Sequence, residues 1–433
     1  MNIFWFRRDL RLGDNAGLFH ALKEGKHVIP LFIFDSNILD DLEDKNDRRV
    51  NFIHHSLLEL NKQLIALGSS LLVKHGKPLR VFKELVNELT IQEVFANHDH
   101  EPYAVQRDEE VKGFLQSKNI SFQTFKDHLI FERKEVMKDD GTPYTVFTPY
   151  SKKWKAALND VHLKSFETEK YFHHFHKSTT FKVPSLAAIG FNKTDLEIPV
   201  TIISDELIRN YGNTRDFPAI SGTSRLSVHL RFGTMSIRKL ASRAKLLSEK
   251  YFNELIWREF YSQILWNFPR VITQSFRPEY DRIKWRNNEN DFEAWCNGKT
   301  GFPIVDAGMR ELNATGYMHN RVRMITAGFL TKDLLIDWRW GEAYFAKKLF
   351  DFELASNNGG WQWAASSGVD AAPYFRIFNP TSQALRFDGE MKYIRKWIPE
   401  LDSFEYPQPI VDHAMARDRA LMVYKEGIRR DVP

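Results

Sequence analysis

The feature that most constrains the fold is a change in hydrophobic periodicity along the chain. Up to about residue 132, short apolar runs that favour strands alternate with amphipathic stretches that favour helices. This alternation is typical of a parallel sheet with helices on both faces, a Rossmann-like α/β domain. No G-x-G-x-x-G follows these runs, so nothing indicates a nicotinamide dinucleotide site. We expect strands at 3–6, 28–34, 71–73, 94–96 and 122–125, with helices such as 51–67 and 81–89 between them.

The rest of the chain indicates a linker and a second domain. Residues 133–200 are polar, with Lys, His, Ser, Thr and scattered Pro, and long segments of this kind are usually functional or connect domains. From 201 to 433 the pattern is helical almost throughout. A chain of 433 residues, 43% of them hydrophobic, can bury two substantial cores. We therefore predict an α/β domain over 1–132, an interdomain linker over 133–200 and an all-α domain over 201–433.

Composition excludes several classes of protein. No apolar run approaches the roughly 20 residues of a membrane span. The start also lacks the residue order of a signal peptide, so we expect a cytoplasmic protein that does not bind membranes. A single cysteine, Cys296, excludes an internal disulfide and a cysteine-rich zinc site. The histidines show no metal-ligand spacing, so we predict no metal. The net charge of +5 permits a nucleic-acid partner without requiring one, and we expect a monomer.

Tryptophan is concentrated in one part of the chain. Eight of the eleven tryptophans lie between residues 257 and 363, and residues 357–376 read N-N-G-G-W-Q-W-A-A-S-S-G-V-D-A-A-P-Y-F-R. Such a concentration indicates a ring-lined pocket or an electron path, but a helical core that uses large rings as packing material would look the same. Clustering alone leaves both interpretations open.

Five motifs carry a resemblance to a known family. Their order along the chain is the one found in the photolyase and cryptochrome family, and the match spans nearly the whole sequence. Within that family the chain is most similar to the bacterial class I photolyases that repair cyclobutane pyrimidine dimers. The motifs are W-F-R-R-D-L-R-L-G-D-N at 5–15, G-T-S-R-L-S at 222–227, N-E-L-I-W-R-E-F-Y at 253–261, G-Y-M-H-N-R-V-R-M at 316–324, and the segment that begins at Asn357.

The resemblance implies that FAD is the cofactor and that the helical domain binds it. Independently of the family, Thr223 and Ser224 before a helical pattern indicate a helix N-terminus with hydroxyl caps, which would suit a diphosphate but is also an ordinary cap. In the family this segment is the FAD phosphate cradle. The FAD-binding residues implied are Tyr211, Thr223, Ser224, Arg225, Leu226, Ser227, Arg258, Arg323, Asp351, Glu353 and Asn357.

Two of these matches imply charged contacts, and two positions depart from the family. The resemblance implies a buried ion pair between Arg323 and Asp351 that faces the flavin. Glu353 stands where the family usually has aspartate, which keeps the charge and adds a methylene. Tyr251 stands where relatives often carry tryptophan, so the ring is kept and its geometry changes.

Asn357 bears on the chemistry of the flavin. An asparagine near the reactive flavin nitrogen cannot supply a carboxylic proton, so the reduced anion can serve as the electron donor. Plant cryptochromes typically have aspartate at this position. From the local sequence alone, an asparagine shortly before Gly359 is equally typical of a helix cap.

A lesion pocket is predicted around Glu254 and Trp257, which are three residues apart and so share a face of a helix. A carboxyl beside an indole suits a flipped-out pyrimidine dimer, although a solvated glutamate on an amphipathic helix is the alternative. The resemblance pairs Trp257 with Trp363 as the two walls and adds Asn320 and Met324. Photolyases for (6-4) lesions carry histidine at both of the last two positions, so that substrate is not expected.

The resemblance assigns two further groups of residues. One binds the phosphates that flank the lesion, because guanidinium forks suit phosphate oxygens; as isolated residues, each could equally be a surface or ion-pair arginine. Its members are Arg215, Arg321 and Arg376. The other is a three-indole relay that carries electrons from the surface to an oxidised flavin. Its members are Trp361, Trp338 and Trp285.

A second, antenna chromophore of unknown identity is possible in this family. Folate-binding relatives use a glutamate after the fourth strand and a lysine in the 270s loop. Here Ala104 stands at the glutamate position and residues 270–280 contain no lysine, so a folate antenna is not expected. A deazaflavin, a second flavin or an empty cleft remains open.

We therefore predict a light-driven DNA repair enzyme, a carbon–carbon lyase whose partner is DNA that contains pyrimidine dimers. Reduced FAD excited by near-UV or blue light would donate an electron to the flipped-out dimer and receive it back after the ring splits. One alternative is a cryptochrome-type blue-light photoreceptor without repair activity, which Asn357, the two pocket tryptophans and the lack of a C-terminal extension disfavour. Another is a flavin-free nucleic-acid-binding protein, which a yellow or blue purified sample would exclude.

Overall fold

The computed structural model describes residues 1–25 and 27–429, and the chain forms two compact units. The division follows contacts rather than chain order: divisions fall after Glu132 and Ile202, at or near the predicted boundaries, and further divisions fall within the predicted linker and the predicted helical domain. Both units draw on the segment 133–200, and residues 225–246 belong to the first unit. The first unit comprises Met1–Glu132, Ala157–Ile202 and Arg225–Leu246, and the second comprises Arg133–Ala156, Ile203–Ser224 and Leu247–Pro433.

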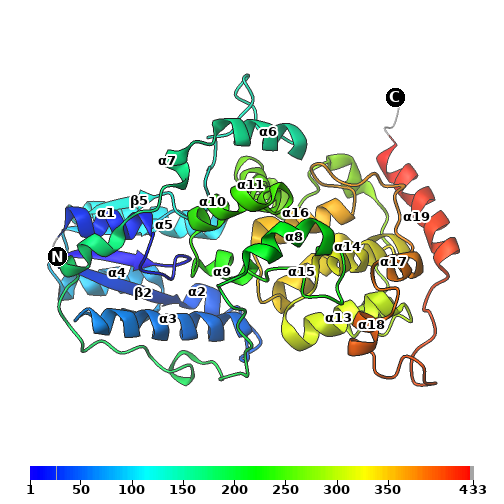
Figure 1. Ribbon diagram of the computed structural model, residues 1–433, viewed down its shortest axis with the longest axis horizontal. Coiled ribbons are helices and arrows are strands. Elements are labelled where there is room, and N and C mark those ends of the chain that lie inside the picture. The colour runs from blue at the N-terminus through cyan, green and yellow to red at the C-terminus, as the bar shows by residue number, and fades with distance from the viewer. Residues whose placement is uncertain (26, 430–433) are drawn as a thin grey trace. The chain divides into compact units, whose positions relative to one another are not determined.

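The first unit is built on a five-stranded, all-parallel sheet with the strand order β3-β2-β1-β4-β5 (Figure 1). At the centre of the sheet, Ile3 of β1 is in register with Ile29 of β2 on one side and with Val94 of β4 on the other. All five predicted strands are confirmed, with ends that differ by up to three residues. The strands are β1 (Asn2–Phe6), β2 (Val28–Asp35), β3 (Leu72–Gly76), β4 (Glu93–Asn97) and β5 (Ser121–Phe125).

Helices cover both faces of this sheet, as predicted. Because parallel crossovers are right-handed, the strand order puts α1 (Ala16–Glu24) and α3 (Arg48–Ala66) on one face and α4 (Pro78–Glu88) and α5 (Pro102–Ser117) on the other. Trp5 faces α4, where its ring centroid lies 5.0 Å from that of Phe82. Phe4 points the opposite way and lies close to Gly17 of α1. A short helix, α2 (Ser36–Leu39), follows β2.

Later segments join the sheet unit through buried charge. Arg238 is buried and donates to Asp14 at 2.9 Å and to Asp127 at 2.7 Å. Although burial raises the pKa of Asp127, the guanidinium groups of Arg11 and Arg238 hold it well below its usual range. These ion pairs explain why a segment late in the chain belongs to the first unit. The elements of this unit beyond β5 are α7 (Asp160–Leu163), η1 (Thr168–His174), η2 (Ala187–Ile189), α9 (Ser227–Phe232) and α10 (Ile237–Leu247).

Part of the predicted linker is helical. Helix α6 (Phe147–Ala157) buries Phe147, Tyr150 and Trp154, and the Trp154 indole donates to Glu259 of the second unit at 2.5 Å. The sequence pattern did not predict this helix, because the polar residues between the three rings obscure their helical spacing.

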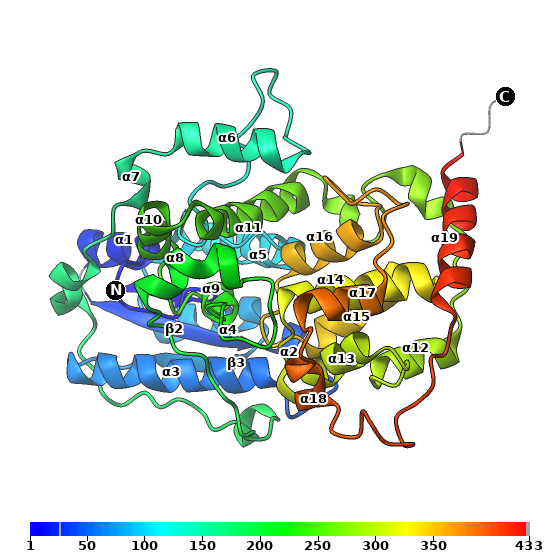
Figure 2. The ribbon, with the colours of Figure 1, turned by 45° about the vertical axis from the view of Figure 1, so that its right-hand side comes forward.

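The second unit is helical, as predicted. One of its core clusters includes the buried rings of Trp295, Trp338 and Trp361. Helix α19 (His413–Ile428) packs against the 3₁₀-helix η4 (Pro278–Arg282) and the π-helix η5 (Phe329–Asp333) (Figure 2). The other elements are α6, α8 (Asp205–Thr214), α11 (Glu249–Asn267), η3 (Pro269–Ile272), α12 (Glu289–Cys296), α13 (Pro303–Thr315), α14 (Asn320–Gly328), α15 (Trp338–Lys348), α16 (Leu354–Ala364), α17 (Pro380–Phe387) and α18 (Lys392–Trp397).

In the described part of the chain, no helix has the length and hydrophobicity that a transmembrane segment needs. Across residues 1–25 and 27–429, no group of three or more His, Cys, Asp or Glu side chains is arranged to hold a metal ion.

The Arg238→Met variant tests the buried charge cluster. We expect the free energy of unfolding of the first unit to fall by about 3–5 kcal/mol, because the buried carboxylate of Asp14 loses its guanidinium partner and Asp127 keeps only Arg11. Urea titration followed by circular dichroism measures the change. The matched control is Lys245→Met on the same helix, whose side chain is more exposed and lies 4.0 Å from Asp160, and it should change stability little. Equal losses in the two variants would contradict the interpretation.

Candidate active site

The predicted lesion-pocket residues Glu254 and Trp257 lie one turn apart on α11, which confirms that they share a helix. Phe147 of α6 stacks on the Trp257 indole, with ring centroids 3.7 Å apart and planes 4° from parallel. One indole face is thus covered by the protein, while Trp257 remains partly exposed. The sequence did not predict this contact, because Phe147 is distant from Trp257 in the chain and no local pattern links the two residues.

Glu254 forms an ion pair with Arg215, which caps the C-terminal end of α8. The Arg215 and Glu254 side chains are 26% and 33% exposed, so solvent reaches the pair. Burial raises the pKa of Glu254, and the guanidinium opposes that shift without cancelling it. One of the predicted phosphate-binding arginines therefore contacts the predicted lesion-binding carboxyl directly.

Helix α14 carries three residues that are predicted to contact the lesion or the DNA backbone. The Asn320 amide lies 3.9 Å from the sulfur of Met324, which confirms that these two share a helix face. Arg321 forms an ion pair with Asp216 at 2.7 Å. Arg376 is exposed, with its guanidinium carbon 5.8 Å from the ring centroid of Phe378.

Two guanidinium–carboxylate pairs lie among the residues predicted to bind FAD. Arg323 and Asp351 form the predicted ion pair, at 3.0 Å. Arg258 donates to both carboxylate oxygens of Glu353, at 3.1 and 2.9 Å, and both side chains are 10% exposed. The glutamate that replaces the usual aspartate is therefore held in a two-point contact.

In the predicted phosphate cradle, the hydroxyl groups of Thr223 and Ser224 lie within hydrogen-bond distance of tyrosine hydroxyls. The Tyr251 hydroxyl donates to the Ser224 oxygen at 2.8 Å, and its ring lies edge-on to that of Tyr211 with centroids 5.0 Å apart. Thr223 lies 3.4 Å from the Tyr317 hydroxyl. The tyrosine that replaces tryptophan thus binds Ser224 through a group that an indole lacks.

The prediction that Thr223 and Ser224 cap a helix is wrong. Helix α9 begins at Ser227, with Leu226 as its N-cap residue and no side-chain cap hydrogen bond. Arg225 has a left-handed φ of 52°, which turns the backbone before the helix starts. Arg225, Leu226 and Ser227 belong to the first unit, and Thr223 and Ser224 to the second.

Asn357 lies inside α16, one turn from its start, so the alternative of a helix cap is wrong. Its amide nitrogen donates to the Glu342 carboxyl at 2.9 Å and to the Glu342 carbonyl at 3.2 Å. Burial raises the pKa of Glu342, and the hydrogen bond from Asn357 opposes the shift. Because the nitrogen is committed to Glu342, the amide orientation is determined. The sequence did not predict this contact, because no local pattern links Glu342 to Asn357.

The three relay candidates all contact the core cluster around Trp295. Trp361 and Trp338 are 2% and 1% exposed, while Trp285 is partly buried at its edge. Trp295, which lies 6.0 Å from Trp361 between ring centroids, is an additional indole near the predicted path. The exposure of the three rings agrees with Trp285 as the outermost member, and the relay itself stays a prediction.

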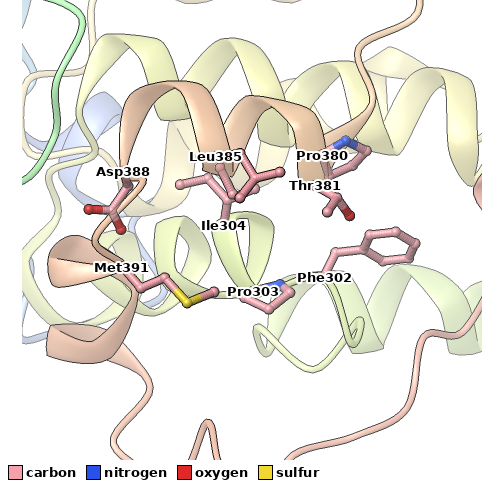
Figure 3. Close-up of a pocket in the computed structure, with 9 residues that line it drawn as sticks. Phe302, Pro303, Ile304, Pro380, Thr381, Leu385, Asp388 and Met391 are labelled. Carbon is pink, nitrogen blue, oxygen red and sulfur yellow. The ribbon is translucent and has the colours of Figure 1, made fainter.

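An apolar hollow of about 80 Å³ lies elsewhere in the second unit. Side chains from α17 face those from the start of α13 (Figure 3). The carboxylate of Asp388 accepts hydrogen bonds from the backbone amides of Tyr393 and Ile394, so it serves α18 rather than a ligand. No predicted site residue lines this hollow, and its lining does not suit a charged cofactor.

The predicted antenna loop belongs to the first unit. Ala104 is buried in α5. The neighbouring Tyr103 hydroxyl donates to Asp35 at 2.6 Å. Arg107 lies over the Trp5 ring, 5.0 Å from its centroid. These residues lie near the carboxyl ends of the strands, where open α/β sheets commonly bind ligands.

Comparison with known proteins identifies the family. Residues 2–169 match the family model "DNA photolyase", and residues 251–405 match "FAD binding domain of DNA photolyase". The deoxyribodipyrimidine photo-lyase of Halobacterium salinarum is 36% identical, and the alignment covers 99% of each chain. The chain therefore belongs to the DNA photolyase family, and its helical unit carries the FAD-binding domain of that family.

Solved structures agree over the whole chain. A class III photolyase from Agrobacterium tumefaciens has a TM-score of 0.86 and 32% identity, with 98% of this chain and 97% of that chain covered. An archaeal photolyase from Sulfolobus tokodaii, solved with two FAD molecules, has a TM-score of 0.82 and 35% identity, with 98% of this chain and 100% of that chain covered. These similarities confirm the predicted fold class.

The residues of the helical unit fit an FAD. Gly360 of α16 lies one turn from Asn357, and a Cβ atom built there would meet no atom within 4 Å. The two guanidinium–carboxylate pairs and the oriented amide of Asn357 supply donors and acceptors of the kind that a flavin with sugar and phosphate groups requires.

The Asn357→Asp variant tests the contact with Glu342. Two buried carboxyl groups in hydrogen-bond contact share a proton, so the pKa of the pair should rise above that of ordinary carboxyl groups. A raised folded-state pKa means that stability is complete below the unfolded pKa, near 4, and is lost as pH rises. We expect the free energy of unfolding to fall by up to about 1.4 kcal/mol for each pH unit in that window.

The control is Asn357→Leu, which removes the hydrogen bond without adding a charge. Its loss of stability should grow less steeply with pH than that of Asn357→Asp, because only Glu342 titrates and no second carboxyl is added. Thermal or urea unfolding over this range measures both variants. Parallel pH profiles in the two variants would refute the contact.

Proposed function

We propose that this chain is a deoxyribodipyrimidine photo-lyase, an enzyme that splits cyclobutane pyrimidine dimers in DNA under light. The observation that carries the proposal is the Trp257 indole, which is stacked on Phe147 on one face, is partly exposed and stands one turn from Glu254. A supported ring beside a carboxyl suits a flipped-out base with carbonyl groups. The full-length similarity to proteins of that name supports the same conclusion.

The residues around the cofactor would prepare it for electron donation. When bound, reduced FAD would supply an electron on excitation by near-UV or blue light, and the cyclobutane ring would open without net oxidation. Asn357, oriented by Glu342, offers the flavin no carboxylic proton, which favours the anionic reduced form. The Arg323–Asp351 and Arg258–Glu353 ion pairs would contact FAD. Because each pair is neutral, the two pairs would add little net charge to the cofactor site.

The lesion pocket would be completed from three helices. Trp257 and Trp363 would stack against the dimer, and Asn320 and Met324 would line the pocket from α14. A pyrimidine carbonyl gains negative charge when the dimer accepts an electron, and a protonated Glu254 would stabilise it by a hydrogen bond. The raised pKa of Glu254 supports this protonated form.

Arg215, Arg321 and Arg376 would bind the DNA backbone. Their guanidinium groups suit phosphate oxygens and would position the strand without reading its sequence. For the antenna, Ala104 argues against folate, and a deazaflavin, a second flavin or no second chromophore are the alternatives.

The proposed function is tested with chemically reduced holoprotein and an oligonucleotide that carries one cyclobutane thymine dimer. We expect blue light to restore the thymine absorbance and darkness to leave it unchanged. A cryptochrome-type photoreceptor without repair activity would leave the absorbance unchanged in both. No recovery under light with the lesion fully bound would refute the proposal.

The relay is tested separately with Trp285→Phe. If Trp285 is the outermost indole, the variant should photoreduce oxidised FAD at least about tenfold more slowly, because phenylalanine is far harder to oxidise. Repair by chemically reduced enzyme should persist, because it requires only excited reduced flavin. Transient absorption and single-turnover repair measure the two activities. Trp397→Phe is the control, since that ring contacts the same core cluster outside the predicted path. Loss of both activities in Trp285→Phe would show that this ring is a packing residue.

Glu254 is tested by its repair quantum yield. We expect Glu254→Ala to keep the FAD spectrum and most of the dark affinity for damaged DNA, yet to split fewer dimers per absorbed photon. Glu254→Gln should lose less, since an amide still donates a hydrogen bond to the carbonyl. Pre-reduced protein with lesion DNA in saturating excess is the required condition. A wild-type yield in the alanine variant would mean that Glu254 only occupies the pocket wall.

A further inference from the structure

A row of alternating charges links three helices of the second unit. Glu254 of α11 contacts Arg215 at the end of α8. Asp216, the next residue, lies 3.9 Å from Arg215 and 2.7 Å from Arg321 of α14. The order is therefore carboxylate, guanidinium, carboxylate, guanidinium. We call this row the charge row.

At the Arg321 end of the charge row, one hydrogen-bond donor lacks an acceptor among the described residues. The Nε atom of Arg321 is buried and has no hydrogen-bond partner in the described part of the chain. The guanidinium carbon of Arg321 lies 4.4 Å from the ring centroid of Phe387, which fixes the plane of the group. A buried guanidinium donor without an acceptor in the protein can bind the oxygen of a water or of a ligand.

The charge row has no net charge as it stands, because two carboxylates neutralise two guanidinium groups. Arg215 is engaged by Glu254, so an incoming phosphate must compete for the same donors. The pair is partly exposed, and ion pairs of this kind are weak enough for a charged ligand to displace. A phosphodiester offers oxygens that match the guanidinium fork.

We propose that a DNA backbone phosphate beside the flipped-out lesion displaces Glu254 from Arg215, and that the released Glu254 carboxylate takes up one proton from solvent. One ion pair, Arg215 with Glu254, is broken, and another, Arg215 with phosphate, is formed. The new O–H of Glu254 is then free to donate to a base carbonyl. Arg215 thereby couples DNA binding to the protonation that the lesion requires. This inference rests on the proposed function.

The groups that face Glu254 support proton uptake at this residue. On the α8 side these are Arg215, the following Asp216 and Tyr211, and on α11 itself there is Tyr261. Burial raises the pKa of both tyrosines, so they stay neutral near neutral pH. Burial and Asp216 both raise the pKa of Glu254, and Arg215 alone among these groups opposes them. Glu254 is therefore the group whose protonation changes when Arg215 is taken by another anion.

The test is isothermal titration calorimetry in darkness at about pH 6. Oxidised holoprotein is titrated with an oligonucleotide that carries one thymine dimer, in buffers of different ionisation enthalpy. The slope of binding enthalpy against buffer enthalpy counts the protons taken up. We expect a positive slope of up to about one proton for the wild type. Glu254→Gln should bind with a slope near zero.

Arg215→Ala distinguishes two causes of proton uptake by Glu254. One is displacement of Glu254 from Arg215 by a phosphate, and the other is burial of Glu254 under the lesion. In this variant Glu254 has lost its guanidinium partner before DNA arrives, so it should already be protonated. We expect about tenfold weaker binding and a slope near zero, although Glu254 is present. Glu206→Gln, an exposed carboxylate of α8, is the control and should keep the wild-type slope and affinity.

The outcomes distinguish this inference from the proposed function. Binding by the wild type with no proton uptake would overturn the exchange, as would a wild-type slope in Arg215→Ala or Glu254→Gln. Unchanged FAD absorbance in each variant confirms that it is folded. Failure of the wild type to bind lesion DNA at all would instead refute the proposed function.

Discussion

The candidate site depends on the close approach of α16 to its two neighbours. At Gly359, a Cβ atom would come within 2.1 Å of the Tyr261 ring of α11. At Gly341 of α15, a Cβ atom would come within 2.1 Å of the Trp361 ring of α16. Glycine is needed at both positions because no side chain fits between helices packed this tightly. This packing holds Asn357, Trp361 and Trp363 on one rigid element.

Large rings in the helical unit have two different kinds of surroundings. Trp338 and Trp361 are enclosed in the core, where burial of their surface stabilises the unit. Trp257 has only one face enclosed, by Phe147. A half-covered indole is held in place by its neighbour and still presents area to a ligand. The same residue type thus fills the core in one place and leaves ring surface open to solvent in another.

Several guanidinium groups of the helical unit are paired with carboxylates. Arg258 and Glu353 are both 10% exposed, and Asp351 beside Arg323 is 7% exposed. Glu254 beside Arg215 is 33% exposed, so solvent reaches that pair. Buried pairs are difficult to break because each partner would be left as an unpaired charge. Exposed pairs exchange partners readily, which separates the structural arginines from those able to meet a nucleic acid.

The sequence by itself determined the elements whose pattern is local. The strands and most helices follow from short-range periodicity, and the shared faces of Glu254 with Trp257 and of Asn320 with Met324 follow from helical spacing. Family resemblance, rather than pattern, supplied the Arg323–Asp351 pair. Only the tertiary structure decided which distant residues meet. Phe147 covers Trp257, Glu342 orients Asn357 and Asp216 joins two arginines, because such contacts depend on how helices pack and leave no trace in local spacing. The same reason explains the hydroxyl cap predicted at Ser224, where a tertiary hydrogen bond from Tyr251 and a left-handed turn at Arg225 prevail over the local signal.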